Sequence, residues 1–478
     1  MVDQNLRAGV TCENHHTGDF ALNNAFEDRI AAHLSNTQFE DLPPEAIDAA
    51  KKCILDILGV MAAGSSADGI ASLIRLLEGK SMQPQATVLI TGARLSAHDA
   101  TWVNGAMARA REMDDSHDAT GHHISVPIVP AALAVIELLG KASGRDLLLA
   151  YVLAADLSAR MRLASPHRSG ETGFAANTYS PFMAAAVAAR LLGLKGETMR
   201  HAMAWAYAQC AGGLQLQQSG SSALHIHHGL AAAAGLQAAL LARHGLPGPD
   251  EFLTGRFGFY AAYDGGNPDL SKFTDRLGER FEVTRIAIKQ FPCGRVTHGP
   301  IEAAIALHRE NAIRPEDIEE VVVLYGPRGF KMTCEPESER RLPTNVQHAK
   351  FSLYYVVASA LVRGHVGLED FTPEAVADPE VRQVASRIRV NQDPALRGIP
   401  GGDVTVRLKQ GLQIRHQVPV LTGTPDRPLS YADCAAKFRR CVEFAASPLA
   451  KDKVEAAIDF VANLESAGNV HNLVTLLT

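Results

Sequence analysis

The sequence lacks the glycine-rich signatures of several large enzyme classes. No GxGxxG follows a predicted strand, no GxxxxGK[ST] is present, and no GxSxG marks a hydrolase nucleophile. The 478-residue chain also lacks an uninterrupted apolar run of about 18 residues, the length that a membrane span requires. These absences argue against nicotinamide enzymes, ATPases and membrane proteins.

The composition is neither basic nor rich in cysteine. A net charge of −6 argues against a nucleic-acid-binding protein, because such proteins normally carry a basic excess. The seven cysteines stand singly, without a CxxC pair, which is typical of reduced thiols and not of a disulfide framework. Residues 1–21 lack the pattern of a signal peptide and are predicted to form a tail. We therefore expect a soluble cytoplasmic protein.

Helical periodicity dominates the chain from residue 22 to residue 280. The run PEAIDAAKKCILDILGVMAAG has apolar residues at three- to four-residue spacing, and its last residue, Gly64, is a candidate C-terminal cap. Ser143 and Asp146 form a predicted capping box ahead of another apolar stripe. Two further runs, PFMAAAVAARLLGL and GLAAAAGLQAALLARHG, are rich in alanine, which favours closely packed helices in a buried bundle.

The pattern changes after residue 280. RFEVTRIAIK (280–289) and IEEVVVLYG (318–326) are predicted strands, and residues 402–418 alternate as in a hairpin. Between them, IEAAIALHREN and HAKFSLYYVVASALVRG are predicted helices. We therefore expect a mainly α fold with an α+β part. The expected domains are a helical domain at 22–280, an α+β domain at 281–418, and C-terminal helices at 419–478 that rejoin the helical domain.

Two groups of histidines could carry chemistry: His117, His122 and His123, and then His225, His227 and His228. Neither group has HExxH spacing or a companion cysteine, so acid–base or hydrogen-bonding roles are favoured and no metal is predicted.

The acidic residues before the first histidine group suggest one such role. Glu112, Asp114 and Asp115 lie close together, where like charges repel unless cations or backbone donors compensate. The functional interpretation is an active-site loop whose carboxylates orient His123 as a proton carrier. The alternative is a helix end followed by a solvated loop.

The stretch IKQFPCGRVTHGP places charged residues where a predicted strand gives way to a helix. Lys289 ends the apolar run, where partial burial would favour the neutral amine that a base requires. Arg295 can hold a carboxylate bidentately, and the helix that begins near Pro300 directs backbone N–H groups at an anion. The alternative is a turn with solvated charges. Cys293 is interpreted as a packed thiol, with a nucleophile as the alternative.

Four motifs occur together with CILDILGVMAAG in the order seen in one family. They are NGAMARAREMDDSHD, LHIHHGLAAAAGLQAALLA, IKQFPCGRVTHGPIEAA and HAKFSLYYVVASAL. On these the chain resembles the MmgE/PrpD family, which includes 2-methylcitrate dehydratases, cis-aconitate decarboxylases and iminodisuccinate epimerases. The resemblance covers roughly residues 25 to 470. It implies a large helical domain with a smaller, lid-like α+β domain, a homodimer and no cofactor.

The resemblance also implies a set of site residues. The family's acidic loop corresponds to Glu112, Asp114 and Asp115, with Ser116 where a threonine is common. Its histidines correspond to His123 and His298, and its lysine to Lys289. Asn345 and Lys350 flank a further stretch that could contribute.

Two family positions differ in this chain. Phe174 stands where dehydratases and decarboxylases carry a histidine, and Leu224 stands at a lysine position, with His227 at the following histidine. Tyr179 and His225 are candidate replacements. The departures place a standard 2-methylcitrate or cis-aconitate substrate in doubt.

The expected function is a lyase of the 2-methylcitrate dehydratase type that acts on a small di- or tricarboxylate. Lys289 would be the base, His123 the partner acid and Tyr179 a further catalytic residue. The residues expected to hold the substrate are Glu112, Asp114, Asp115, Ser116, His225, His227, Arg295 and His298. An iminodisuccinate-type epimerase and a cis-aconitate-type decarboxylase remain as alternatives. So does a catalytically silent homologue that serves as a dimeric binding protein.

Overall fold

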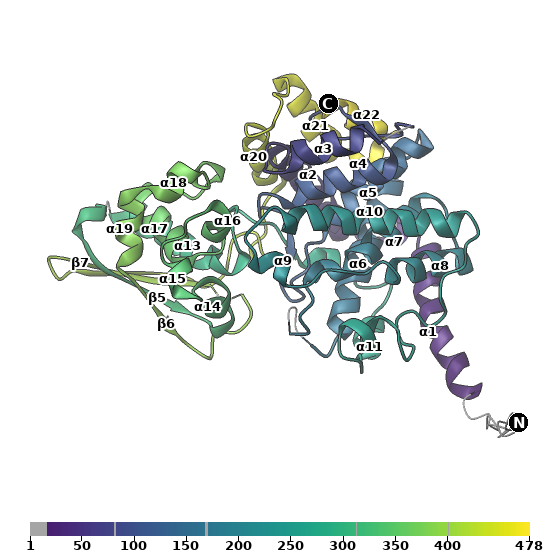
Figure 1. Ribbon diagram of the computed structural model, residues 1–478, viewed down its shortest axis with the longest axis horizontal. Helices are drawn as coiled ribbons and strands as arrows, with labels where there is room; N and C mark the ends of the chain where they lie inside the picture. The colour runs from purple at the N-terminus through teal and green to yellow at the C-terminus, as the bar shows by residue number, and fades with distance from the viewer. Residues whose placement is uncertain (1–16, 81–82, 168–170, 312, 400) are drawn as a thin grey trace, which may run out of the picture.

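The computed structural model describes residues 17–80, 83–167, 171–311, 313–399 and 401–478. Figure 1 shows two bodies beside each other, a larger helical body and a smaller body that contains a sheet. The expected mainly α fold with an α+β part is confirmed. Of the expected tail, residues 1–16 lie outside the described part, and the first helix already begins at Thr17. No helix in the described ranges is long and apolar enough to cross a membrane.

The helical body is built from both ends of the described chain. Its helices are α1 (Thr17–Asn36), α2 (Pro44–Gly64), α3 (Ile70–Glu78), α4 (Ala97–Arg109), α5 (Ser125–Leu139), α6 (Gly144–Ala164), α7 (Ser180–Leu191), α8 (Gly196–Tyr207), α9 (Gln215–Gln218), α10 (Ala223–Arg243), α11 (Phe259–Tyr263), α12 (Leu270–Thr274), α20 (Tyr431–Val442), α21 (Lys451–Ala462) and α22 (His471–Leu476). Two antiparallel pairs of short strands complete it: β1 (Ala86–Thr87) with β2 (Arg94–Leu95), and β3 (Ser116–His117) with β4 (Ile286–Ala287).

Helices α4 and α10 pack closely against each other. A Cβ added at Gly229 of α10 would lie 2.1 Å from the Trp102 carbonyl oxygen of α4. At Gly105 of α4, an added Cβ would lie 2.9 Å from the Cα of Gly229. Only glycine therefore allows this approach, and the alanine-rich sequence of α10 serves the same end.

The end of helix α2 differs from the expectation that Gly64 is a C-terminal cap. Gly64 is the last residue of α2 and does not act as a left-handed cap. Its role is close packing, because an added Cβ would lie 1.9 Å from the Met107 carbonyl oxygen. The C-terminal helices α20 and α21 pack against α2, so the yellow end of the chain lies beside the blue helices in Figure 1.

The smaller body has a four-stranded sheet. Its helices are α13 (His298–Asn311), α14 (Pro327–Thr333), α15 (Glu337–Arg340), α16 (Val346–Lys350), α17 (Leu353–Arg363), α18 (Pro373–Ala377) and α19 (Pro379–Ser386). Its strands are β5 (Ile318–Tyr325), β6 (Ile388–Gln392), β7 (Gly402–Leu408) and β8 (Gln413–Val418), in the order β6-β5-β7-β8. β5 is parallel to β6, and the other pairs are antiparallel. Burial alternates along β7, as expected for a sheet with one face under helices such as α13.

The expected hairpin and the strand at 318–326 are confirmed by β7–β8 and β5. The predicted strand at 280–289 is wrong for most of its length. A 3-10 turn occupies Glu282–Arg285, and only Ile286 and Ala287 form strand β4.

One predicted helix, HAKFSLYYVVASALVRG, is divided into α16 and α17. The Ser352 hydroxyl oxygen accepts a hydrogen bond from the Tyr355 backbone N–H at 3.0 Å, which starts a new helix there.

Two hydrophobic cores correspond to the two bodies. One consists of residues up to Ile288 and of the C-terminal helices, together with Leu368, and the other consists of residues between Phe291 and Leu421. The domain boundaries at residues 281 and 418 stay a prediction.

Candidate active site

A cavity of about 870 Å³ is lined by residues from both bodies. Arg109, at the end of α4, and the loop after it form one side, and α10 contributes Leu224 and His228. The segment between β4 and α13 and helix α14 form the side that belongs to the smaller body. The two stretches that the sequence singled out, the acidic loop and IKQFPCGRVTHGP, therefore meet in one cavity.

His123 is held by a buried carboxylate. Its Nδ1 lies 2.5 Å from the Asp114 carboxylate, which also accepts a hydrogen bond from Arg109 at 3.3 Å. Burial would raise the pKa of Asp114, but the charges of His123 and Arg109 outweigh it and hold that pKa well below its usual range. Burial and Arg109 together lower the pKa of His123. A neutral His123 that donates through Nδ1 keeps Nε2 as its proton-accepting nitrogen.

Lys289 is paired with Glu112 on the same side of the cavity. The Nζ donates to the Glu112 carbonyl oxygen at 3.0 Å and to its carboxylate at 3.3 Å. Arg109 forms an ion pair with the same carboxylate. Burial would raise the pKa of Glu112, but Arg109 and Lys289 outweigh it, so this pKa lies below its usual value. Glu112 has a left-handed backbone with φ 53°, a conformation that few non-glycine residues adopt.

Arg295 is paired with a carboxylate across the cavity. Its Nε and Nη2 donate to Asp118 at 3.0–3.3 Å, and its Nη1 donates to His298 Nδ1 at 3.3 Å. Asp118 belongs to the loop after α4, whereas Arg295 precedes α13, so this bidentate pair connects the two bodies.

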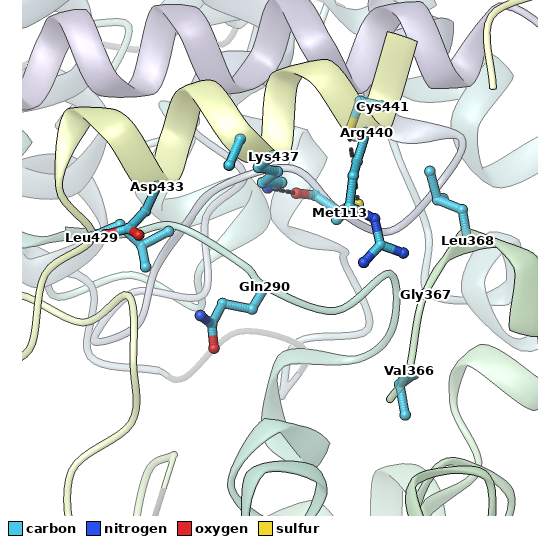
Figure 2. A pocket seen from close by; sticks show the side chains of 11 residues that line it. Met113, Gln290, Val366, Gly367, Leu368, Leu429, Asp433, Lys437, Arg440 and Cys441 are labelled. Carbon is cyan, nitrogen blue, oxygen red and sulfur yellow. Dashed lines mark hydrogen bonds between the residues drawn. The ribbon is translucent and has the colours of Figure 1, made fainter. Parts of the chain in front are cut away.

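Three buried lysines hold the backbone of the acidic loop. Lys350 donates to the Ala110 carbonyl oxygen at 2.9 Å, Lys289 to that of Glu112, and Lys437 to that of Met113 at 2.8 Å. Burial lowers the pKa of Lys350 to about 7. Figure 2 shows the hydrogen bond from Lys437 to Met113. Both residues, together with Gln290, line a second cavity of about 200 Å³. The loop geometry is therefore fixed from several sides.

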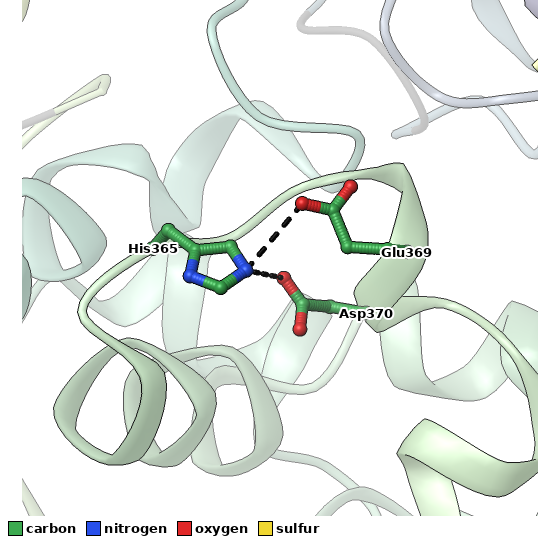
Figure 3. Close-up of side chains that lie close together, drawn as sticks. All are labelled: His365, Glu369 and Asp370. Atoms are coloured by element: carbon green, nitrogen blue, oxygen red, sulfur yellow. Dashed lines mark ion pairs between the residues drawn. The ribbon is translucent and has the colours of Figure 1, made fainter. Parts of the chain in front are cut away.

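One further group of side chains resembles a metal site in composition. His365 Nε2 lies 3.4 Å from the Glu369 carboxylate and 3.7 Å from that of Asp370 (Figure 3). Both carboxylates already pair with arginines, Glu369 with Arg440 at 2.9 Å and Asp370 with Arg363 at 2.5 Å. Because these ion pairs account for the group, we assign no metal to it.

Comparison with known sequences agrees with this arrangement. The MmgE/PrpD N-terminal domain matches residues 28–271, and the MmgE/PrpD C-terminal domain matches residues 291–465. The chain belongs to the MmgE/PrpD family. The expected membership is confirmed, and residues 272–290, which include Lys289, lie between the two matched regions.

Curated relatives of this MmgE/PrpD protein are named as lyases. The human cis-aconitate decarboxylase is 27% identical over 94% of this chain and 93% of its own length. The Aspergillus terreus cis-aconitate decarboxylase is 25% identical over 99% and 97%. The 2-methylcitrate dehydratase of Cupriavidus necator is 24% identical over 75% and 76%. The expectation of an enzyme of the lyase class is confirmed.

Five of the predicted site residues line the cavity of the MmgE/PrpD protein: Glu112, Ser116, His123, Lys289 and Arg295. Asp114 lies behind His123, and the structure brings it into the site through that contact.

The other predicted residues make contacts elsewhere. Asp115 accepts hydrogen bonds from the backbone N–H and the hydroxyl of Ser125, at the start of α5. Burial raises the pKa of Asp115 to about 7. His298 is buried beside Phe291, with Nδ1 bonded to Arg295. These residues support the loops that form the cavity.

Two histidines of the second group, His225 and His227, make contacts outside the cavity. His225 donates to the Asp68 carbonyl oxygen at 2.9 Å, and His227 accepts from the Asn177 side chain at 2.6 Å. Neither is among the cavity-lining residues.

Tyr179 does not replace the family histidine at the cavity. Its hydroxyl donates to Asp264 and accepts from Arg162 at 3.2 Å, and burial raises its pKa. The expectation that Tyr179 is catalytic has no support from its position, because it is not among the cavity-lining residues.

The two departures from the family pattern are placed differently. Leu224 lines the cavity, where it presents an apolar surface, whereas Phe174 packs its ring 4.9 Å from that of Tyr263.

Cys293 is confirmed as a packed thiol. It is fully buried, its sulfur lies 3.3 Å from the Thr297 hydroxyl, and burial raises its pKa to about 12.

The sequence interpretation missed Arg109 and Asp118, and it left His228 of the second histidine group out of the predicted site. Arg109 could have been found from its position three residues before Glu112 at the end of a helix, where a cation can pair with that acid. His228 stands four residues after Leu224 on α10, so helical periodicity predicts that both share one face. Asp118 has no signal in the sequence, because its partner is 177 residues away.

Proposed function

We propose that this MmgE/PrpD protein is a cofactor-independent lyase that removes a proton from carbon next to a carboxylate of a small polycarboxylate. One observation carries the proposal: a His123–Asp114 pair lies in the same cavity as the cations Lys289 and Arg295. A carbon acid next to a carboxylate is weak, so its ionisation needs both a base and nearby positive charge.

The charge of the cavity supports an anionic substrate. Five cationic side chains and three carboxylates line it: Arg109, Lys289, Arg295, Arg328 and Lys331, and Glu112, Asp118 and Glu171. The excess of positive charge would attract a dianion.

The contacts favour an exchange of the two expected catalytic roles. Lys289 donates to two acceptors on Glu112 and forms an ion pair with its carboxylate, whereas His123 keeps a proton-accepting nitrogen. We therefore assign His123 as the base. The remaining N–H of Lys289 would stabilise the charge that develops on the substrate carboxylate, or protonate a leaving hydroxyl group.

Elimination of the 2-methylcitrate dehydratase type is our first candidate reaction, because Lys289 can supply the proton that a leaving hydroxyl group needs. Decarboxylation of a cis-aconitate-type substrate is the second candidate; in it a C–C bond breaks in place of a C–H bond, and carbon takes up a proton, which Lys289 can supply. It is favoured by relatives of that name that match nearly the whole chain. Epimerisation of an iminodisuccinate-like compound requires the same proton abstraction, with return of the proton on the other face.

Proton NMR in D₂O tests the proposal with a panel of 2-methylcitrate, cis-aconitate and N-substituted aspartates. A new alkene signal establishes elimination, loss of a carboxylate establishes decarboxylation, and deuterium incorporation with inversion establishes epimerisation. His123→Gln should slow the reaction by about 10²–10⁴-fold. His244→Gln, the same substitution at an exposed residue after α10, should leave it unchanged. Binding of the panel without turnover would instead support a catalytically silent homologue.

We further propose a homodimer, as the family resemblance implies, and a location in the cytoplasm, as the composition suggests. Light scattering after size-exclusion chromatography tests the dimer, and fractionation of the source cells tests the location.

A further inference from the structure

His228 is a cavity-lining histidine to which the proposed function gives no role. It lies on α10, one helical turn after Leu224, and is 3% exposed. Its Nδ1 donates to the Leu224 carbonyl oxygen at 2.9 Å. That bond fixes the neutral tautomer with the proton on Nδ1, so that Nε2 keeps the lone pair.

His123 and His228 form an edge-to-face pair. Their ring centroids lie 5.8 Å apart, and their planes meet at 85°. In both rings Nδ1 is already bonded, to Asp114 in His123 and to the Leu224 carbonyl in His228. Burial lowers the pKa of both imidazoles, and Arg109 adds to the effect. Two neutral imidazoles, each with Nε2 available, therefore lie in one cavity.

The perpendicular planes matter because a lone pair of an imidazole lies in the plane of its ring. Two Nε2 lone pairs that lie in nearly perpendicular planes can therefore approach one carbon from different directions. A single base would reach only one of the two hydrogens of a methylene group in a fixed substrate.

We propose that His228 is a second proton acceptor of this site, and that His123 and His228 each exchange a different hydrogen of one substrate methylene group. The inference rests on the proposed function. In each exchange a C–H bond breaks and an Nε2–H bond forms. The electron pair of the C–H bond passes into the adjacent carboxylate, beside Lys289 and Arg295, and returns to carbon when the imidazolium gives a proton back.

The number of deuterium atoms at one carbon tests the inference. Purified enzyme is incubated to completion with cis-aconitate in D₂O, and the methylene carbon is examined by NMR and mass spectrometry, in recovered cis-aconitate or in the product formed from it. We expect two deuterium atoms with the wild type and one with His228→Gln, however long the incubation. His123→Gln should also stop at one, much more slowly formed. His244→Gln is the matched control and should reach two.

A merely structural role for His228 would slow both exchanges and still give two deuterium atoms at completion. Two deuterium atoms with His228→Gln, or one with the wild type, would therefore overturn the inference. Calorimetric titration with cis-aconitate and the melting temperature show whether the variants fold and bind. If the wild type exchanges no deuterium, the proposed proton abstraction itself fails on this probe, and the inference fails with it. That outcome is distinct from a wild type that exchanges one.

Discussion

The two histidine groups differ in the partner that fixes the cavity-facing ring. In each group one histidine of three lines the cavity, His123 in the first and His228 in the second. A buried carboxylate holds His123, whereas a backbone carbonyl holds His228. A carboxylate stabilises the imidazolium that forms on proton uptake far more than a neutral carbonyl does. We therefore expect His123 to be the stronger base and His228 the weaker.

The remaining histidines of both groups form hydrogen bonds with neighbouring residues outside the cavity. In the first group, His117 contacts Glu282 at 3.3 Å, and His122 contacts Ser158 at 2.7 Å. A cluster of histidines in the sequence thus divides in space into one chemical and two structural members, and substitutions should separate the two kinds.

Loss of His123 should have the largest effect. His123→Gln removes the proposed base, and removal of a positioned base costs about 10²–10⁴-fold in rate. We expect kcat to fall by that amount, with little change in melting temperature, because the side chain is partly exposed to the cavity. Initial rates on the substrate that the NMR panel identifies provide the measurement. A variant that keeps more than a tenth of the activity would remove His123 from the role of base.

Asp114→Asn tests whether the carboxylate next to His123 makes it the stronger base of the two. Loss of the negative charge should lower kcat/KM by roughly 10²-fold, because the imidazolium loses its counter-ion. The charge of Asp114 raises the pKa of His123, so the variant should have a lower His123 pKa. A base works in its neutral form, so the acidic limb of the kcat/KM profile should move to lower pH. An unmoved limb together with reduced activity would show that Asp114 only positions the ring.

Lys350 extends the comparison to another base held by a carbonyl. Its pKa of about 7 in the folded protein lies below that of an unfolded lysine, so the unfolded chain binds more protons between pH 7 and about 10. Stability from this group is therefore absent below pH 7 and grows as the pH rises. Relative to Lys350→Met, the wild type should gain about 2 kcal/mol in unfolding free energy between pH 7 and pH 9. Urea denaturation of both proteins at the two pH values measures the gain. A difference that does not change with pH would mean that Lys350 stays charged in the folded protein.

Much of the fold could be predicted from interactions that are local in sequence. The capping box of Ser143 and Asp146 forms as expected, because its partners are three residues apart. The strand at 280–289 fails because a strand needs a neighbour, and β3 offers only Ser116 and His117 for pairing.

In the candidate site, too, residues with partners nearby in the sequence could be predicted, and residues placed by distant contacts could not. His123 could be predicted because its acidic partner stands nine residues before it in the same loop. The sequence favours His225 and His227 over His228, since the family pattern stresses position 227 and only the packing of α10 shows which face meets the cavity. Tyr179 is a candidate in the sequence because it lies five residues after Phe174, but its hydroxyl contacts Asp264, 85 residues away.

His122→Gln should give the smallest effect, and one of the opposite kind to that of His123→Gln. His122 is fully buried, shares a hydrogen bond with Ser158, and packs its ring 4.5 Å from that of Tyr179. A buried hydroxyl that loses its partner costs about 1–3 kcal/mol, so the unfolding free energy should fall by that amount. The kcat/KM of the folded variant should match the wild type, because His122 does not line the cavity. Denaturation curves and initial rates on the same preparations separate the two effects. Activity lost beyond the unfolded fraction would show that His122 reaches the reaction, and the division of the first group into one chemical and two structural histidines would then be wrong.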